Sequence, residues 1–155
     1  MGLEELLLQH PSSESQDVLF SETESMTLAR ARRRVSEIAS TLEIETGQAV
    51  AVQLQNGPEL LCTMVAIWTR GAVHVPINER LTDPEVESIL SETGAAVFIG
   101  IDGARLLSGT TVYPDDVAFI IWTSGTTGTP KPILHTHTAY LELLDRVLGP
   151  LRGKG

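Results

Sequence analysis

Cysteine is almost absent from this sequence. Cys62 is the single thiol among 155 residues, which excludes an intramolecular disulfide and any zinc cluster built from cysteines alone. It lies within an apolar run, where a buried thiol without a chemical role is the expected state. This cysteine usage fits a reducing compartment, so we expect a cytoplasmic protein. Aromatic residues make up only 5% of the chain, and aliphatic side chains must therefore fill the core.

Positive charge is also scarce. The 11 Lys and Arg residues face 20 Asp and Glu residues, which gives a formal net charge of −9. A protein dedicated to nucleic acid must neutralise phosphates with Lys and Arg, so this balance argues against nucleic acid as a partner. Only Lys131 and Lys154 are lysines, and the position of Lys131 therefore carries information.

Long apolar runs are missing too. The most apolar stretch, Leu60 to Trp68, is far shorter than the roughly 20 residues that a membrane-spanning helix needs. The N-terminus has no basic region ahead of its short apolar stretch, and Leu6 stands where a myristoylation motif needs Ser or Thr. We therefore expect a soluble protein that does not bind a membrane.

The order of polar and apolar segments predicts a leader followed by one domain. Residues 1–25 end in a polar stretch that reads as a leader segment, and we place the domain in residues 26–155. Apolar residues recur at helical spacing from Met26 onward, with Ser25 as the expected N-cap. Two further helices are predicted to begin at Asn56-Gly57-Pro58 and at Asp83-Pro84.

Strand candidates alternate with these helices. They are the apolar runs Ala49–Leu54, Ala72–Pro76, Ala95–Ile99 and Val117–Trp122. Such alternation predicts βαβ units, and near-continuous apolar strands fit a sheet that is buried on both faces. The predicted fold class is therefore α/β, a mostly parallel sheet with helices on both faces. Ligands of such sheets bind beyond the carboxyl ends of the strands, so the loop after Trp122 is the first candidate site.

That loop combines hydroxyl side chains, glycines and a lysine. It reads Thr123-Ser124-Gly125-Thr126-Thr127-Gly128-Thr129-Pro130-Lys131. Glycines let backbone N–H groups approach a ligand, successive N–H groups form an anion-binding concavity, and Lys131 adds a positive charge. We predict that the loop binds nucleotide phosphates. Composition alone also allows a solvated turn between two elements, and the spacing matches neither the Walker motif nor GxGxxG.

Other polar residues favour structural interpretations. Arg30, Arg32, Arg33 and Arg34 could form an anion patch, but Glu37 lies at ion-pairing distance along the helix, which favours a solvated face.

His135 and His137 could ligate a metal, but no third ligand stands near them, and Thr136 or His137 is expected to start the next helix. Asp115 and Asp116 precede the strand, at the end opposite the loop, so a solvated turn is expected there. Trp68 and Trp122 are expected in the core.

The segment IIWTSGTTGTPK, residues 120–131, resembles the signature loop of adenylate-forming enzymes. This superfamily includes acyl-CoA synthetases, adenylation domains of nonribosomal peptide synthetases, and luciferases. Residues 49–82 are similar to the family's flanking strand, Asn-x-Pro-Glu helix and following Gly-Ala-Val strand, and Thr136-His137 matches the family's usual Thr-His. The resemblance covers roughly residues 26–150 and implies the N-terminal subdomain of these enzymes.

The resemblance implies ATP and a carboxylic acid as ligands. In the family the carboxylate attacks the α-phosphorus, pyrophosphate leaves, and a thiol of coenzyme A or a carrier protein accepts the acyl group. Carried over to this sequence, the loop would hold the β- and γ-phosphates, with Mg²⁺ between their oxygens. The implied cofactor-binding residues are Thr123, Ser124, Gly125, Thr126, Thr127, Gly128 and Lys131. The loop supplies no nucleophile, so no catalytic residue and no protein metal ligand is assigned within this chain.

The sequence departs from the family pattern at one position of the loop. Pro132 stands where the family commonly has Gly. Proline removes an N–H that could serve the phosphates, or it stiffens the start of the next strand. We favour the second interpretation, because a donor-rich loop already lies upstream.

The family's adenine-binding segment, ribose-binding aspartate and C-terminal domain with its lysine have no counterpart here. We therefore expect a truncated N-terminal part of an acyl-CoA synthetase or adenylation domain that is inactive by itself. The alternative is a non-catalytic nucleotide- or phosphate-binding module, or one subunit of a split enzyme. A sheet that is cut short leaves an open edge, so we also expect self-association.

Overall fold

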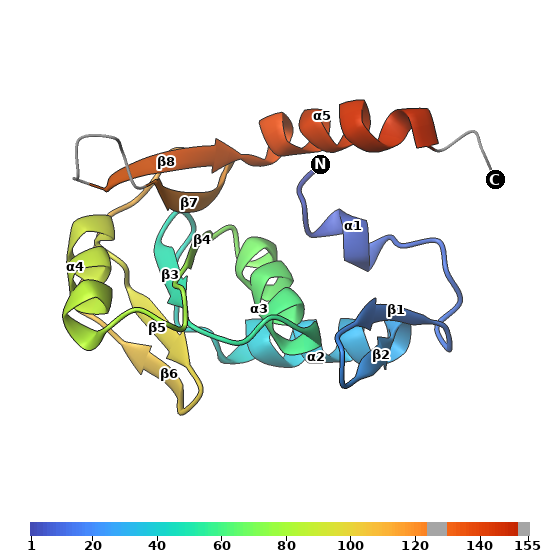
Figure 1. Cartoon of the computed structure of the whole chain (residues 1–155), viewed down its shortest axis with the longest axis horizontal. Helices are drawn as coiled ribbons and strands as arrows, with labels where there is room; N and C mark the ends of the chain where they lie inside the picture. The colour runs from blue at the N-terminus through green and yellow to red at the C-terminus, as the bar shows by residue number, and fades with distance from the viewer. Residues whose placement is uncertain (124–129, 152–155) are drawn as a thin grey trace.

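A six-stranded sheet organises residues 1–123 and 130–151, the part of the chain that the computed structural model describes (Figure 1). Its strands are β3 (Ala49–Val52), β4 (Val73–Pro76), β5 (Val97–Gly100), β6 (Gly103–Leu106), β7 (Val117–Thr123) and β8 (Lys131–Thr136). In space they follow the order β6-β5-β3-β4-β7-β8. A separate hairpin joins β1 (Asp17–Phe20) and β2 (Ser25–Thr27).

The helices of the described ranges are α1 (Glu5–Leu8), α2 (Leu28–Thr41), α3 (Pro58–Thr69), α4 (Asp83–Thr93) and α5 (His137–Leu148), followed by a 3₁₀ turn at Gly149–Leu151. Helices α3 and α4 separate β3 from β4 and β4 from β5 along the chain. No helix in the described ranges is long and apolar enough to cross a membrane.

The predicted mostly parallel sheet is confirmed. Strands β5, β3, β4 and β7 pair in parallel, and the four predicted strands lie within two residues of their expected bounds. The sheet differs from a purely parallel one at its edges, where β6 pairs antiparallel with β5 and β8 pairs antiparallel with β7. Strand β6 was not predicted, because its four residues are all exposed and carry no apolar pattern.

Helices cover both faces of the sheet, as expected. Val50 and Val52 of β3 pack in one core with α2 and α3, including Leu28, Val35 and Ile67. The alternate residues Ala49 and Ala51 pack in a second core that includes Val73, Val75 and, from α4, Val86 and Leu90. Because successive side chains of a strand point to opposite faces, β3 contributes to both cores, and all four of its residues are buried.

The start of α2 corrects the predicted cap. Ser25 belongs to β2, and Thr27 is the N-cap, with its hydroxyl oxygen accepting the backbone N–H of Arg30 at 3.3 Å. The prediction failed because Ser25 and Met26 belong to strand β2, so the helix begins two residues later than the apolar spacing indicates. Helix α3 begins at Pro58 with Gly57 as its N-cap, as the Asn56-Gly57-Pro58 segment predicted.

The predicted leader contains secondary structure that packs on the domain. Leu3 and Leu7 are buried, and α1 and β1 lie within residues 1–25. Leu3 joins a small core with Ala118 and Phe119 of β7. The N-terminal segment therefore contacts the strand that leads into the candidate loop.

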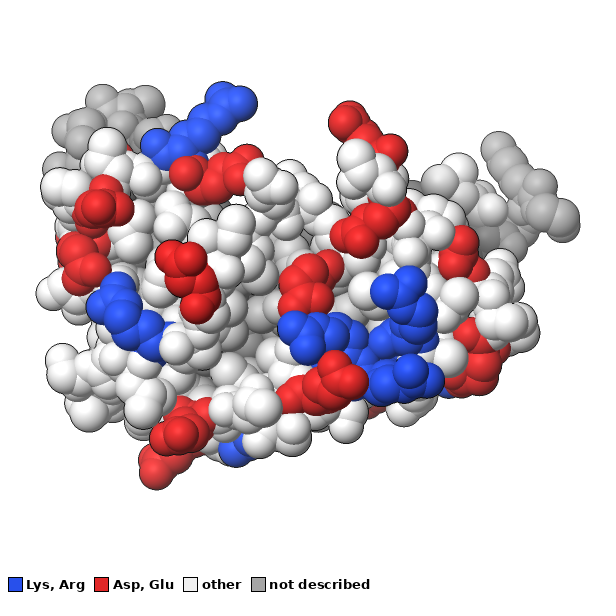
Figure 2. Space-filling view, turned by 90° about the horizontal axis from the view of Figure 1, so that it is seen from below, with Lys and Arg blue, Asp and Glu red and all other residues white. Residues whose placement is uncertain are grey.

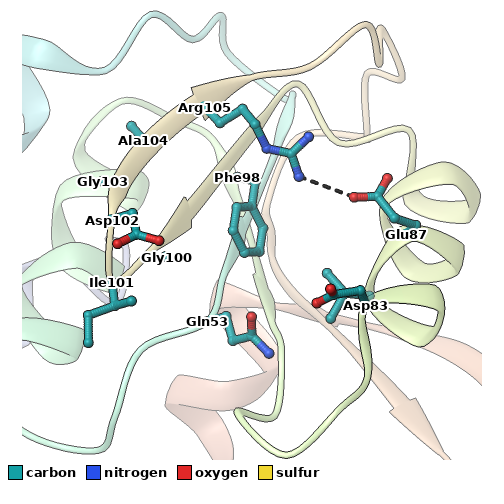
Figure 3. Close-up of a pocket in the computed structure, with 11 residues that line it drawn as sticks. Gln53, Asp83, Glu87, Phe98, Gly100, Ile101, Asp102, Gly103, Ala104 and Arg105 are labelled. Carbon is teal, nitrogen blue, oxygen red and sulfur yellow. Dashed lines mark hydrogen bonds and ion pairs between the residues drawn. The ribbon is translucent and has the colours of Figure 1, made fainter.

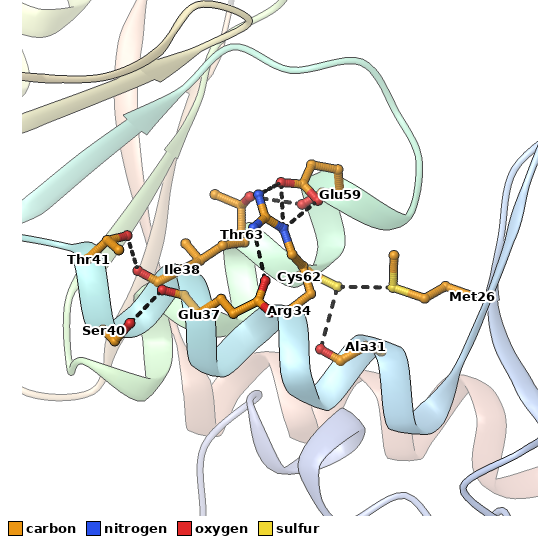
Figure 4. Close-up of polar contacts among 10 residues, drawn as sticks. All are labelled: Met26, Ala31, Arg34, Glu37, Ile38, Ser40, Thr41, Glu59, Cys62 and Thr63. Atoms are coloured by element: carbon orange, nitrogen blue, oxygen red, sulfur yellow. Dashed lines mark hydrogen bonds and ion pairs between the residues drawn. The ribbon is translucent and has the colours of Figure 1, made fainter.

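Two of the four arginines in the basic cluster on α2 form ion pairs with acidic residues. Arg34 forms a bidentate pair with Glu59 of α3, with Nε donating to Oε1 at 3.1 Å and to Oε2 at 3.0 Å, and its Nη1 donates to Glu37 (Figure 4). Arg32 pairs with Glu14. Figure 2 shows Asp and Glu side chains around the Lys and Arg side chains on this face. This arrangement supports a solvated, ion-paired face rather than an anion site.

We predict that the free energy of unfolding falls as the pH falls from about 6.5 to 4. Burial lowers the pKa of His74 from 6.5 to about 4, so between these pH values His74 is protonated in the unfolded chain and neutral in the folded chain. Below pH 4 the free energy of unfolding is lower by about 3 kcal/mol than at neutral pH because of this one group. Urea unfolding at pH 7.0, 5.5 and 4.5 measures it. His74→Gln, which cannot titrate, should flatten this dependence, and an unchanged slope in that variant would contradict the assignment.

We also predict that Cys62 resists thiol reagents in the folded chain. Its side chain is fully buried beside Met26 and Ala31 (Figure 4), and burial raises its pKa to about 11. Because the thiolate is the reactive form, labelling at pH 8 should be slow without urea and rapid above the unfolding midpoint. Equal rates in both conditions would mean that the thiol is accessible.

Candidate phosphate-binding hairpin

The candidate loop joins the two strands of an antiparallel hairpin. Strands β7 and β8 pair from Val117↔Thr136 to Thr123↔Lys131. Thr123 and Lys131, the first and last of the predicted site residues, are therefore register partners at the end of the ladder. The other predicted residues, Ser124, Gly125, Thr126, Thr127 and Gly128, lie outside the described residues, as does the side chain of Thr123.

The direction of β7 puts this end of the hairpin at the ligand-binding edge of the sheet. Strand β7 runs parallel to β4, with Phe119 opposite His74, and β3 and β5 run the same way. The carboxyl ends of all four strands therefore lie at one edge, where ligands of open α/β sheets bind. Lys131 is exposed at this edge.

A cavity of about 410 Å³ lies between the hairpin and α4. Most of its wall is apolar, and its polar lining residues include Asn78, Glu85 and Glu92. Hydrogen bonds from the N-cap Thr82 lower the pKa of Glu85 and keep that carboxylate charged. The full lining is Pro76, Asn78, Leu81, Glu85, Ser88, Ile89, Glu92, Ile121, Trp122 and Pro130.

Trp122 lines this cavity instead of lying in the core. Its side chain is half-buried, and its Nε1 is a buried donor without a hydrogen-bond partner among the described residues. The prediction of a core tryptophan is wrong here, because Trp122 borders the cavity between the hairpin and α4. Trp68 is also half-buried, but its Nε1 donates to the carbonyl oxygen of Ala118 at 2.8 Å and fixes α3 against β7.

A second cavity of about 530 Å³ lies on a different side of α4 (Figure 3). Arg105 of β6 crosses its mouth, pairing with Glu87 at 3.2 Å and lying 5.3 Å from the centre of the Phe98 ring. Gln53, Asp83 and Asp102 also line it. Of the described residues at the ends of the loop, neither Thr123 nor Lys131 borders this cavity.

The far end of the hairpin is held by a network of hydrogen bonds. Thr136 is the N-cap of α5, with its hydroxyl oxygen accepting the backbone N–H of Ala139 at 3.1 Å. Asp116 accepts the backbone N–H of His137 at 2.8 Å through its carbonyl oxygen. The expectation that Asp116 lies opposite the loop is confirmed, although it anchors α5 in addition to forming a turn.

The two histidines contact different aromatic rings. The ring of His135 stacks on Phe119 with centroids 4.8 Å apart, and that of His137 meets the edge of Trp68 at 5.8 Å. Nδ1 of His137 accepts the backbone N–H of Leu3 at 2.9 Å. Burial lowers the pKa of His137, against the opposing effect of Glu4 and Asp116.

No group of three or more His, Cys, Asp or Glu residues in the described ranges is arranged to hold a metal ion.

Sequence reasoning missed the contact between the N-terminal segment and this hairpin. The signal for it was weak, since Leu3 and Leu7 are the buried members of a short apolar run. Pro132 lies in β8, the last strand of the sheet among the described residues, and edge strands tolerate proline because one side of their backbone is not paired. This position agrees with the favoured interpretation that Pro132 belongs to the strand after the loop.

The comparison with known families decides the identity of the fold. The family described as "AMP-binding enzyme" matches residues 8–113 and 102–151, nearly the whole chain. The chain belongs to the AMP-binding enzyme family. Its membership confirms the resemblance to adenylate-forming enzymes that the loop and its flanks indicated.

Relatives and solved structures agree with this membership. The long-chain-fatty-acid–CoA ligase FadD13 of Mycobacterium tuberculosis is 35% identical over 138 residues, covering 67% of this chain and 27% of FadD13. A feruloyl-CoA synthase of Amycolatopsis is 33% identical over 140 residues, covering 73% and 28%. The N-terminal subdomain of Klebsiella oxytoca NpsA, solved in complex with 3-hydroxyanthranilyl-AMSN, matches with a TM-score of 0.70 and 26% identity, covering 88% and 40%. The chain thus spans about a quarter of the length of these curated relatives.

The alignment to this AMP-binding family is interrupted near β6. The stretch aligned with FadD13 is 138 positions long but includes only 67% of this chain, about 104 residues, so about 34 positions are occupied in FadD13 alone. The two family matches overlap at residues 102–113, which lie between β5 and β7.

We predict that Thr136→Ala lowers the free energy of unfolding by about 1 kcal/mol, because α5 loses its N-cap. Thr138→Ala is the matched control, since Thr138 is exposed and does not cap the helix. Urea unfolding and hydrogen exchange of the α5 amides measure the effect. Equal losses in the two variants would show that the cap contributes nothing.

Proposed function

We propose that this chain is the N-terminal part of an ATP-dependent ligase that activates a carboxylic acid as an acyl-adenylate. The observation that carries the proposal is the position of the two residues that flank the Thr/Ser/Gly segment in the sequence. Thr123 and Lys131 are register partners at the carboxyl edge of an AMP-binding-family sheet. In the proposed reaction the acid's carboxylate attacks the α-phosphorus of ATP and pyrophosphate leaves.

The proposed contribution of this chain to the reaction is electrostatic stabilisation of the phosphates. Hydroxyl and N–H donors of the loop, with the ammonium group of Lys131, would hold the β- and γ-phosphates as negative charge shifts onto them. Donors placed where charge develops lower a barrier without taking part in bond making. The proposal therefore assigns cofactor-binding roles to Thr123, Ser124, Gly125, Thr126, Thr127, Gly128 and Lys131, and no nucleophile.

Mg²⁺ is proposed to accompany ATP. In nucleotide sites this ion binds mainly through phosphate oxygens and water, with one or two carboxylates, so the proposal requires no cage of protein ligands. The carboxylates of Glu85 and Glu92, which line the neighbouring cavity, would repel an unneutralised triphosphate, and the ion would reduce that repulsion. A thiol of coenzyme A or a carrier protein is the proposed acceptor, and the cytoplasm is the proposed location.

A second candidate is a non-catalytic nucleotide- or phosphate-binding module, or one subunit of a split enzyme. The composition of the loop favours it, because hydroxyl groups, glycines and Lys131 can bind phosphate without any catalytic group. Isothermal titration with MgATP separates the candidates. Submillimolar affinity in the isolated chain supports the module, whereas weaker binding supports a ligase part that needs the remaining domain.

The test of the ligase proposal is acid-dependent exchange of pyrophosphate into ATP. The isolated chain should show none. A fusion of this chain to the part of FadD13 that follows the aligned stretch should show exchange with a long-chain fatty acid. In that fusion Lys131→Ala should reduce the exchange rate roughly 100-fold, the usual scale for losing one charge-stabilising donor.

Lys154→Ala is the matched control, because it removes the only other lysine and leaves the loop intact. Its exchange rate should equal that of the parent fusion. Full exchange after Lys131→Ala would remove Lys131 from the mechanism. Equal losses in both variants would show a general effect of charge.

A further inference from the structure

The segment that joins β3 to α3 contains two adjacent residues that can react with one another, Asn56 and Gly57 (Figure 1). Asn56 is exposed, and its side-chain amide has no hydrogen-bond partner among the described residues. The backbone N–H of Gly57 also donates to no group in the described ranges. The fold therefore leaves both of the groups that would react unbonded.

An asparagine that precedes a glycine is open to attack by the backbone. The deprotonated backbone nitrogen of the glycine adds to the side-chain carbonyl carbon of the asparagine, and the side-chain nitrogen leaves as ammonia, which closes a five-membered succinimide ring. Glycine favours the attack because it has no Cβ to crowd the approach. Water then opens the ring at one of its two carbonyl carbons. The product is aspartate, or isoaspartate, in which the backbone runs through the former side-chain carbon.

The surroundings of this segment leave room for the ring and for water. A Cβ placed on Gly57 would meet Ser21 at 3.7 Å and Glu24 at 3.9 Å, which are ordinary contact distances to the turn of the β1–β2 hairpin. A cavity of about 470 Å³ between that turn and the segment is lined by both Asn56 and Gly57. Because Asn56 is exposed, solvent has access to the reacting carbon.

The second asparagine of the chain lacks these features. Asn78 is also exposed, but its Oδ1 accepts the backbone N–H of Arg80 at 2.9 Å. The residue after it is Glu79, whose side chain crowds the backbone nitrogen that would have to attack. The sequence contains no other asparagine, so Asn78 is an internal control for Asn56.

We propose that Asn56 is a site of spontaneous, irreversible deamidation in the folded protein, with water consumed and ammonia released. Each event adds one negative charge to a chain that carries −9. The aspartate product places its carboxylate just before α3, where the helix dipole favours negative charge. The isoaspartate product lengthens the backbone between the buried residues Val52 and Pro58, so this form of the chain is less stable.

Mass spectrometry of the aged chain tests the proposal without any need for ligase activity. Trypsin separates the two asparagines, because cleavage after arginine releases residues 35–70 with Asn56 and residues 71–80 with Asn78. During incubation of the folded chain at pH 8, Asn56 should deamidate at least about ten times faster than Asn78, a ratio that needs only a small difference in barrier. The rate should rise with pH, because the attacking nitrogen must lose its proton.

The chain unfolded in guanidinium chloride is the reference for the effect of the fold. The rates at Asn56 in the folded and unfolded chains should agree within about tenfold, because the reacting groups are already exposed or unbonded in the native state. An Asn56 that persists in the folded chain while the unfolded chain loses it would show protection by the structure and overturn the proposal. Equal rates at Asn56 and Asn78 in the folded chain would also overturn it.

Isoaspartate is detected with an isoaspartyl methyltransferase and labelled S-adenosylmethionine. The signal should grow as the folded chain ages. Asn56→Ser is the control, because serine keeps a polar side chain but has no amide to lose, and it should remove most of the signal. An undiminished signal in Asn56→Ser would assign the isoaspartate to Asp102-Gly103, which is also exposed, and would overturn the proposal.

Urea unfolding separates the effects of the two products. Asn56→Asp carries the same net charge as both products and should keep the midpoint of the parent chain. The aged fraction that contains isoaspartate, separated by ion exchange, should unfold at a lower urea concentration. An unchanged midpoint in that fraction would refute the proposed loss of stability.

Discussion

The parallel pairing of β7 with β4 is the constraint on which the candidate site depends. Phe119 stands opposite His74 in this pair, and Ala118 and Ile120 on either side of it are fully buried. Burial on both faces fixes the direction and register of β7, since a shift by one residue would reverse every side chain. The turn that leaves β7 must then emerge at the carboxyl edge, beside the ends of β3 and β4. An antiparallel β7 would have carried the same loop to the opposite edge.

The two ends of the β7–β8 hairpin are supported unequally. At the base, Asp116, Thr136 and His137 connect the hairpin to α5 and to the N-terminal segment. At the loop end, the described neighbours are a cavity wall and the unpartnered indole nitrogen of Trp122. The base of the hairpin is therefore fixed by more contacts among the described residues than the end at Thr123 and Lys131. The N-terminal segment contributes to the stem through Leu3, although it lies more than a hundred residues away in sequence.

Much of the fold could be predicted because apolar spacing is a local property. The four apolar runs gave the parallel strands, and the 3- and 4-residue spacing from Leu28 to Leu42 gave α2. Features without local patterning were missed. Strand β6 is exposed on all its residues and forms only because Gly103, at φ 108°, allows a tight turn back along β5. The cap at Thr27 and the role of Trp122 depended on neighbours that no spacing reveals.

The sequence by itself determined the family, the alternation of strands and helices, and the composition of the candidate loop, because these depend on residue types in a fixed order. Only the tertiary structure decided that Thr123 and Lys131 face each other across a hairpin, that two of the α2 arginines pair with Glu14 and Glu59, and that α5 has no buried residue within the described part of the chain. These outcomes follow from contacts between distant segments. Their stability depends on burial and geometry that the folded chain creates, and no local pattern encodes them.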